Sequence, residues 1–225
     1  MKRDVNTDDW VIGWKSSYQS DLMTRFRSFF FDRAFWHYGQ ANDPEARILD
    51  IGCGTGFFMS RLLAKGYQRI EGVEPDARLI APALAERVRI SVATALPFED
   101  RRFDVVYFFN VLHHLTRVDD FRIALNEADR CLKPGGTLIM LEPNWRQFYQ
   151  IEAFVSRILS PVWGFASGIH DALMAEWDCL MHFFEHRDVL AAHMSALGYR
   201  LDPERRLLHQ WVLVGHKPGS GKPDL

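Results

Sequence analysis

One stretch decides the fold of this chain, and it reads Ile48-Leu49-Asp50-Ile51-Gly52-Cys53-Gly54-Thr55-Gly56-Phe57-Phe58. Its first part, 47–51, is short, mostly apolar and β-branched, which is typical of a buried parallel strand. Glycine then alternates through 52–56, and apolar residues recur at helical spacing until Gly66. The order is therefore strand, glycine turn and helix. Glycines let a ligand approach the backbone closely, and the free N–H groups of the helix start would face that ligand.

An acidic residue ends the next predicted strand, 69–73. Glu74 stands at its tip, where a carboxylate can accept both hydroxyls of a ribose. Dinucleotide-binding folds carry Gly-x-Gly-x-x-Gly, whereas this chain has Gly-x-Gly-x-Gly with Asp50 just before it. The turn and the acid fit two cofactor classes, a nicotinamide dinucleotide or S-adenosylmethionine.

Several further motifs follow in a fixed order, and together with the glycine stretch they resemble class I S-adenosylmethionine-dependent methyltransferases. They are Glu74, Leu96-Pro97-Phe98, Phe103-Asp104-Val105-Val106, Val111-Leu112-His113-His114-Leu115 and Leu132-Lys133-Pro134-Gly135-Gly136-Thr137-Leu138. The resemblance covers 47–142, and several ordered motifs are far more specific than one glycine motif. It implies an α/β fold: a Rossmann-like, mostly parallel seven-stranded sheet with a C-terminal antiparallel hairpin and a helical cap.

The resemblance also implies which residues hold S-adenosylmethionine. Glu74 would bind the ribose hydroxyls, and Asp50 would lie beneath the glycine loop near the cofactor's ammonium group. The remaining cofactor-binding residues are Gly52, Cys53, Gly54, Gly56, Ala93, Thr94 and Asn110. The alternative for Asp50 is a carboxylate that only holds the amides of the loop. Metal ions are not required for methyl transfer, and no metal site is predicted.

Three residues are candidates for a catalytic base. In some methyltransferases of this pattern a histidine after the fourth strand serves as general base, which points to His114 or His113. Glu142, at the tip of the fifth strand, is the third candidate. The alternative is that the histidine pair only caps the next helix or packs beneath the loop.

One departure from the family pattern concerns adenine. The third strand of the family commonly ends in Gly-Asp-Ala, and that aspartate accepts a hydrogen bond from the adenine amino group. This chain has Ser91-Val92-Ala93, so Val92 stands in the place of the acid. Adenine recognition would then depend on Ala93, Thr94, water or apolar packing.

The chain divides into five predicted parts. They are an N-terminal helical cap at 1–40, a cofactor-binding core at 41–143, a helical acceptor lid at 144–187, a last helix with an edge hairpin at 188–216, and a disordered tail at 217–225. The aromatic lid could also contact a membrane surface, or simply be core. Within it, His182-Phe183-Phe184-Glu185-His186 matches the zinc-protease pattern H-x-x-E-H, which we interpret as lining or surface because it follows a methyltransferase core.

Composition and net charge indicate which binding partners and which cellular compartment to expect. The 225-residue chain has a net charge of −2, so no nucleic-acid partner is expected. Its 3 cysteines are far apart and its start lacks a signal-peptide core, which predicts a cytoplasmic protein; the oligomeric state stays open. The expected function is methyl transfer to a small aromatic, apolar or lipid-like acceptor. The alternatives are a nicotinamide-dependent oxidoreductase and a catalytically silent S-adenosylmethionine-binding protein.

Overall fold

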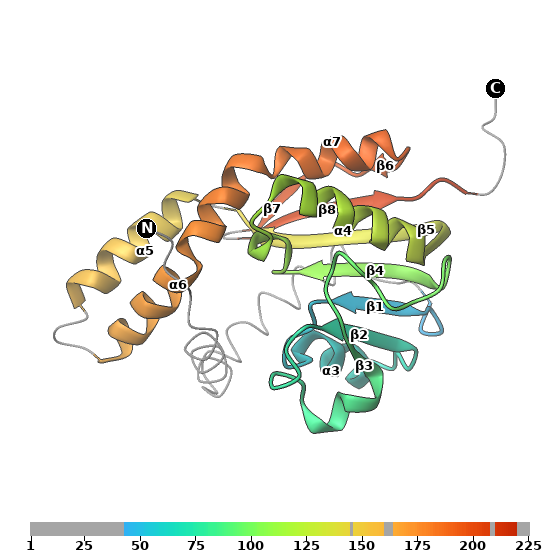
Figure 1. Cartoon of the computed structure of the whole chain (residues 1–225), viewed down its shortest axis with the longest axis horizontal. Helices are drawn as coiled ribbons and strands as arrows, with labels where there is room; N and C mark the ends of the chain where they lie inside the picture. Colours follow the sequence, from blue (N-terminus) through green and yellow to red (C-terminus); the bar gives the residue numbers. More distant parts are fainter. Residues whose placement is uncertain (1–42, 145, 160–163, 208–209, 220–225) are drawn as a thin grey trace.

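The computed structural model describes residues 43–144, 146–159, 164–207 and 210–219 of the chain. The predicted N-terminal cap at 1–40 lies outside these residues. The described part is built on a single twisted sheet with helices on both faces, and a pair of helices extends beyond one end of it (Figure 1).

The strand order of the sheet is β3-β2-β1-β4-β5-β8-β6, and β7 also pairs with β8. The parallel strands are β1 (Ile48–Ile51), β2 (Ile70–Glu74), β3 (Val88–Ile90), β4 (Phe103–Phe109) and β5 (Leu132–Pro143), and the antiparallel ones are β6 (Arg200–Leu201), β7 (Arg205–Leu207) and β8 (Gln210–His216). The prediction of a mostly parallel Rossmann-like sheet is confirmed.

The hairpin edge differs from the prediction in one respect. We expected one strand opposite β8, but two short strands pair with it, because the residues between them leave the ladder. Leu201 pairs with Gly215 and Arg205 with Val212, and the intervening segment contains Pro203, which has no N–H to donate. The described sheet therefore has eight strands where we expected seven.

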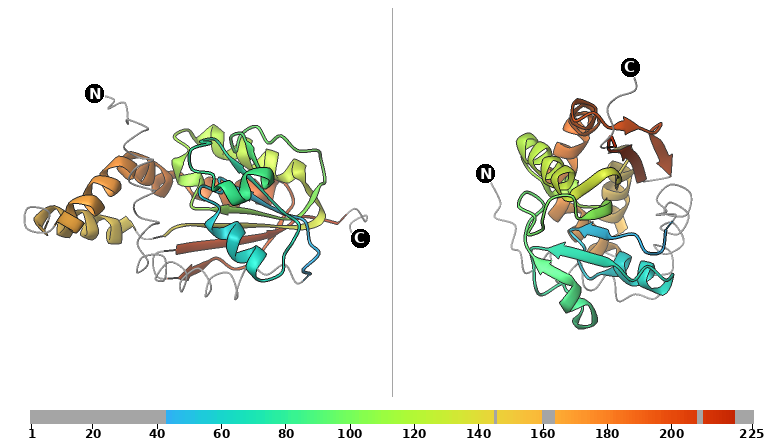
Figure 2. Two further views of the ribbon diagram at one scale, coloured as in Figure 1. Left: turned by 90° about the horizontal axis from the view of Figure 1, so that it is seen from below. Right: turned by 90° about the vertical axis from the view of Figure 1, so that its right-hand side faces the viewer.

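Helices connect the strands and cover both faces of the sheet (Figure 2). They are α3 (Phe57–Ala64), the 3₁₀ turns η1 (Pro82–Arg87) and η2 (Leu112–His114), α4 (Val118–Cys131), α5 (Arg146–Leu159), α6 (Gly164–His186) and α7 (Asp188–Ala196). One core layer includes Phe121, Phe183 and Trp211, and the layer on the other face includes Phe58 and Tyr107. Continuous apolar strands such as β4 supply both layers, as expected of a sheet buried on both sides.

The start of β5 includes the turn-forming residues 133–136 of the last motif. Leu132 already pairs with Phe103, and the register shifts before Val105 pairs with Thr137. Gly135 has a φ of 78°, so this irregularity uses a glycine where a side chain would be strained. The turn residues are thus an irregular part of the strand rather than a break before it.

The C-terminal end of the described chain is held by the core. Lys217 N donates to Gly136 O at 2.9 Å and Gly135 N donates to Pro218 O at 3.1 Å. We expected a disordered tail from residue 217 onward, but these bonds extend the ordered chain to Pro218. Residues 220–225 lie outside the described part.

The carboxyl ends of the parallel strands lie at one edge of the sheet, and α5 and α6 extend beyond that edge (Figure 1). The fold therefore gathers the loops after β1, β2, β4 and β5 on the side where α6 approaches.

None of the helices in the described residues is long and apolar enough to cross a membrane.

Candidate functional site

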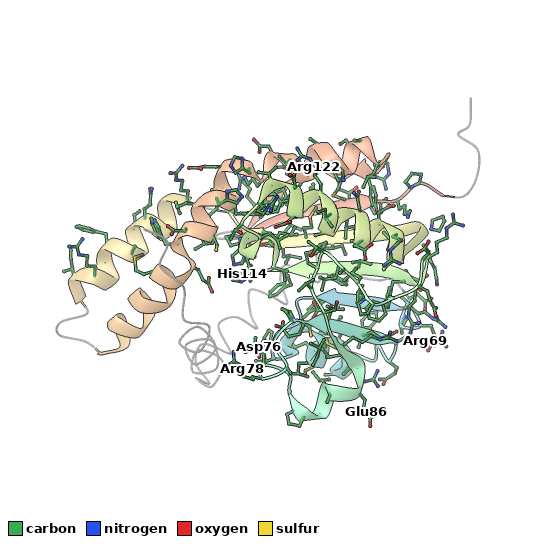
Figure 3. The ribbon with its side chains drawn as sticks, in the orientation of Figure 1. Arg69, Asp76, Arg78, Glu86, His114 and Arg122 are labelled. Atoms are coloured by element: carbon green, nitrogen blue, oxygen red, sulfur yellow. The ribbon has the colours of Figure 1, made fainter. Side chains whose placement is uncertain are left out.

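The predicted site residues lie at the carboxyl edge of the sheet. Figure 3 shows His114 and Asp76 toward this edge, while Arg69, which precedes β2, lies at the opposite end. The glycine loop follows β1, Glu74 ends β2, Asn110 follows β4 and Glu142 lies near the end of β5. Residues distant in sequence are thus brought to one edge.

The glycine loop needs its glycines. Gly52, Gly54 and Gly56 have φ values of 69°, 53° and 75°, which side chains rarely adopt. A Cβ on Gly52 would lie 2.5 Å from a Val111 methyl, and one on Gly56 would lie 2.1 Å from Leu84. The loop therefore packs closely on the segment after β4 and on η1, and this contact places Asn110 and Val111 beside it.

Glu74 is buried and bridges two backbone segments. Gly54 N donates to its Oε2 at 2.9 Å, and Asp76 N donates to its Oε1 at 3.0 Å. Burial raises the pKa of the Glu74 carboxyl, although the two amides counteract this. Each oxygen keeps a further lone pair, so the carboxylate can still accept from a diol.

Asp50 is the least satisfied polar group of this region. Its side chain is 1% exposed, and neither carboxylate oxygen has a hydrogen-bond partner. Burial, and then the charge of Glu74, raise its pKa well above the ordinary range. The alternative in which Asp50 only holds the amides of the loop therefore finds no support, and the group suits a cationic ligand.

The other predicted cofactor residues lie around this loop. Cys53 is buried with its Sγ near Gly72, and burial followed by the charges of Asp50 and Glu74 raises the pKa of its thiol. It is thus not an activated nucleophile. Asn110 has a φ of 54° and donates its N–H to Leu141 O at 2.8 Å, while its buried Oδ1 has no partner.

The loop after β3 forms a compact turn. Ala95 N donates to Val92 O at 3.1 Å, and Ser91 Oγ donates to Ala95 O at 2.6 Å. Ala93 is buried, Thr94 is half-buried and Val92 is 45% exposed. The position of the missing acid is therefore open to solvent.

Glu142 is fully buried, and protein groups occupy both of its oxygens. Val111 N and Leu112 N donate to its Oε1 at 2.9 and 2.8 Å, and His113 Nδ1 lies 2.8 Å from its Oε2. A base must reach the proton that it removes, and this side chain is 0% exposed. The geometry thus corrects our expectation that Glu142 is a candidate catalytic base. Its side chain instead holds the loop after β4.

The two histidines differ sharply. His113 is 3% exposed; burial lowers the pKa of its imidazole, but the hydrogen bond and charge of Glu142 and the charge of Glu176 outweigh burial and raise it overall. His114 is half-buried, its ring lies 4.1 Å from that of His113, and burial followed by the charge of His113 lowers its pKa well below the ordinary range. The pKa values of the two rings are therefore shifted in opposite directions.

Helix α6 adds a residue that no sequence motif indicated. Glu176 Oε2 lies 3.9 Å from His113 Nε2, and its side chain is 22% exposed. Glu176, Leu180 and Phe183 share one helix face by their i, i+4, i+7 spacing, and the latter two are buried. The sequence signal that could have indicated Glu176 is an acidic residue on the buried, apolar face of a helix.

The H-x-x-E-H segment forms the end of α6. The rings of His182 and His186 lie 4.6 Å apart, and His182 Nε2 is buried without a partner. Over the described ranges of the chain, no three metal-ligating side chains come together in a group that could hold a metal ion.

Comparison with known proteins identifies the central segment. Residues 49–140 match the family model described as "Methyltransferase domain". This segment is a methyltransferase domain of the S-adenosylmethionine-dependent class. The resemblance seen in the ordered motifs is thereby confirmed, and S-adenosylmethionine is the cofactor of this class.

Two curated relatives match part of this chain. A "tRNA U34 carboxymethyltransferase" of Azotobacter vinelandii is 34% identical over 103 residues, which are 42% of this chain and 31% of that protein. A "Ubiquinone biosynthesis O-methyltransferase" of Bradyrhizobium is 37% identical over 111 residues, or 45% of this chain and 42% of that protein. The chain thus matches less than half the length of these relatives.

The solved structures show the fold. A SAM-dependent methyltransferase from Aquifex aeolicus superposes with a TM-score of 0.55 at 14% identity, covering 96% of this chain and 99% of that one.

One expectation about partners was wrong. We expected no nucleic-acid partner because the net charge is −2, yet relatives that match part of this chain are named "tRNA U34 carboxymethyltransferase". Net charge is an average over the whole chain, and it does not describe a local binding surface.

The described residues fit S-adenosylmethionine. The orphaned Asp50 carboxylate suits an ammonium group, the glycine loop carries no side chains that would block the approach of a ligand at its glycines, and Glu74 keeps lone pairs for ribose hydroxyls. The departure lies at Val92, where no acid is available for adenine.

Proposed function

We propose that this protein transfers a methyl group from S-adenosylmethionine to an aromatic, apolar or lipid-like acceptor. The buried carboxylate of Asp50 carries the proposal, because both of its oxygens lack partners beneath a loop that only glycines can form. An uncompensated buried charge is costly, and a cationic ligand offsets that cost.

Four elements would hold the cofactor. Asp50 and the carbonyl of Asn110 would bind its ammonium group, Glu74 its ribose, and the turn at Ala93–Thr94 its adenine. When bound, S-adenosylmethionine supplies a methyl group on a positively charged sulfur that is an excellent leaving group. The remaining task of the protein is to place the acceptor in line with that methyl.

Positioning is therefore the main contribution of the chain. The Gly52–Val111 contact and the bonds of Glu142 to Val111 N and Leu112 N fix the two loops against each other. Holding reactants in a productive geometry can lower a barrier by about 7–11 kcal/mol. A loosened loop after β4 should thus reduce turnover even where the cofactor still binds.

The acceptor class follows from the helices beyond the sheet edge. Phe183 of α6 is fully buried and packs near His113 with ring centroids 6.3 Å apart, so core packing holds α6 beside the loop after β4. On α5, Ile151, Phe154, Val155 and Ile158 are 46–66% exposed at one-face spacing. We propose that 144–187 forms the acceptor lid; a relative named for ubiquinone biosynthesis supports an apolar acceptor.

A radiolabelled methyl-transfer screen with phenols, catechols, short-chain quinols and aromatic amines tests this function. We expect transfer that depends on Asp50, with the Asp50→Asn variant impaired. Binding of S-adenosylhomocysteine without transfer to any acceptor would favour the catalytically silent alternative. Binding of NAD in its place would favour the oxidoreductase.

A tRNA is the second candidate acceptor, because a relative 34% identical over 103 residues is named for tRNA modification. The same assay with total bacterial tRNA, with and without ribonuclease, distinguishes the two. Label that ribonuclease releases from the precipitate would assign the acceptor to RNA.

A further inference from the structure

Two backbone amides of the turn proposed to bind adenine have no protein partner among the described residues. In that part of the chain, no acceptor receives a hydrogen bond from Ala93 N or Thr94 N. Ala93 is buried, and a buried amide without a partner is costly unless a ligand accepts from it. The ring nitrogens of adenine are such acceptors. Because Val92 supplies no carboxylate, binding of adenine here depends more strongly on where the backbone of the turn lies.

The residue that follows this turn is bonded at both of its backbone groups to one pair of side chains on α4. Leu96 N donates to Glu127 Oε2 at 2.8 Å, and Arg130 Nη2 donates to Leu96 O at 3.0 Å. Arg130 Nη1 also donates to Phe98 O at 2.7 Å. The backbone two residues beyond Thr94 is thus held by side chains of a helix.

The two side chains of this pair also restrain each other. Arg130 Nε donates to Glu127 Oε1 at 2.9 Å, and Arg130 Nη2 donates to Glu127 Oε2 at 2.8 Å. A guanidinium is planar and its donors form a rigid fork, so the bonds to the carboxylate and to the two carbonyls fix one geometry. The hydrogen bonds of Arg130 outweigh burial and lower the pKa of the Glu127 carboxyl, which keeps it ionised at neutral pH.

A second pair on the same helix makes no such connection. Arg122 and Asp119 have the same i, i+3 spacing and are bonded at 2.9 Å, with side chains that are 45% and 70% exposed. Within the described ranges, neither side chain forms a hydrogen bond with another segment of the chain. Connection to the loop after β3 is therefore a property of the Glu127–Arg130 pair and not of acid–arginine pairs on α4 in general.

We propose that Glu127 and Arg130 are positioning residues for the cofactor: through Leu96 they hold the Ala93–Thr94 turn where its amides can bind adenine. This inference rests on the proposed function. The pair acts through the backbone and need not contact the cofactor. Its loss should weaken binding at the adenine end and leave the methionine end and the alignment of the methyl group unchanged.

The test compares Glu127→Ala with Asp119→Ala, the matched change in the exposed pair of the same helix. Calorimetry measures the affinities for S-adenosylhomocysteine and for 5′-methylthioadenosine, which has the adenosine part but no amino-acid end. We expect Glu127→Ala to weaken the binding of both ligands by the same factor of about two to twelve, the equivalent of one neutral hydrogen bond. Asp119→Ala should leave both affinities within about 1.5-fold of wild type.

Two results would overturn the proposal. One is wild-type affinity of Glu127→Ala for both ligands. The other is a loss of affinity confined to S-adenosylhomocysteine, which would mean that the change disturbs the methionine end of the site. If Glu127→Ala does not fold, Arg130→Lys keeps the charge but loses the fork, and it is compared with Arg122→Lys in the same way.

Turnover gives a readout that general destabilisation would not produce. The adenine base is separated from the reacting methyl group by the ribose. With an acceptor from the screen, Glu127→Ala should therefore raise the KM for S-adenosylmethionine by the same factor and leave kcat unchanged, as expected for a loss of uniform binding. A fall in kcat at unchanged KM would contradict the positioning role. Failure of wild type to bind either ligand would instead count against the proposed function itself.

Discussion

Two buried carboxylates at the same edge of the sheet behave in opposite ways. Asp50, near the end of β1, is 1% exposed and neither of its oxygens is bonded. Glu142, near the end of β5, is 0% exposed and is bonded to two amides and a histidine. Burial alone thus does not indicate a role: a carboxylate without partners suits a ligand, and a saturated one maintains structure.

The largest effect should come from removing the Glu142 carboxylate, both of whose oxygens are bonded. Glu142→Ala leaves two amides and the His113 ring without their partner, and removing one member of a buried pair costs about 3–5 kcal/mol. Urea denaturation should show this loss. The control is Glu71→Ala, which removes a half-exposed pair with Arg102 at 2.7 Å and should cost about 0–1 kcal/mol. Equal losses of unfolding free energy in Glu142→Ala and Glu71→Ala would contradict the structural role of Glu142.

The pH dependence of this variant gives a second readout. The folded-state pKa of His113 is raised, so its charge stabilises the fold fully below the unfolded value of about 6.5. That contribution disappears as the pH rises through the folded pKa. The stability difference between wild type and Glu142→Ala should therefore shrink toward alkaline pH.

The glycine loop should show the next largest effect. Gly52→Ala places a Cβ 2.5 Å from Val111 at a φ of 69°, whereas Gly66 has a φ of 99° and nothing within 4 Å. Both changes incur a left-handed backbone cost of about 1–2 kcal/mol, but only the first adds crowding of about 1–3 kcal/mol. Thermal melting measures the difference. Retention of S-adenosylhomocysteine binding in Gly52→Ala would indicate that the loop is not the cradle.

Asp50→Asn should move stability and affinity in opposite directions. Because its pKa is raised, the charged form of Asp50 destabilises the unliganded fold. The protonated form stabilises the fold fully below the ordinary aspartate pKa of about 3.9, and this stabilisation is lost as the pH rises through the folded-state pKa. At neutral pH the variant should therefore melt higher than wild type without ligand. Its affinity for S-adenosylhomocysteine should fall about 10–150-fold, the equivalent of a charge-assisted bond of about 1.5–3 kcal/mol.

Calorimetry and melting curves on the same samples check this opposition. Asp104→Asn is the control, because Asp104 binds Lys133 at 2.6 Å near the start of β4, away from the cofactor residues. A drop in both stability and affinity for Asp50→Asn would mean that the carboxylate supports the loop.

The smallest expected effect lies at adenine. Val92→Asp restores the acid of the family pattern at a position that is 45% exposed, so desolvation opposes it little. At this exposed position water weakens the bond to the new carboxylate, so we expect the typical hydrogen-bond contribution of about 0.5–1.5 kcal/mol and a rise in affinity for S-adenosylhomocysteine of about two- to twelvefold. Ile90→Asp, at a 62% exposed position, controls for added charge. No gain over that control would mean that adenine is recognised elsewhere.

Much of the fold was predictable because its signals are local. The continuous apolar run at 103–109 forms β4, and a segment of helical periodicity that stops before Pro134 and Gly135 forms α4. Less local features were missed. The split of the edge strand around Pro203 depends on which residues meet β8, and the bulge at the start of β5 depends on pairing with β4.

The site was predictable as a set of positions but not as a set of partners. Motifs named Asp50, Glu74 and Glu142, yet only three-dimensional contacts show that Asp50 lacks partners and that Glu142 has three. Glu176 lies outside every motif, and its approach to His113 arises from the packing of α6 on η2. Hydrogen-bond satisfaction is a tertiary property, which sequence spacing does not encode.

Calorimetric titration of the full chain with S-adenosylhomocysteine, and in parallel with NAD, tests the central claim most directly. The account predicts one site per chain for S-adenosylhomocysteine, affinity that falls in Asp50→Asn and stays in Asp104→Asn, and no heat from NAD. Absence of S-adenosylhomocysteine binding, or NAD binding that Asp50→Asn abolishes, would contradict it.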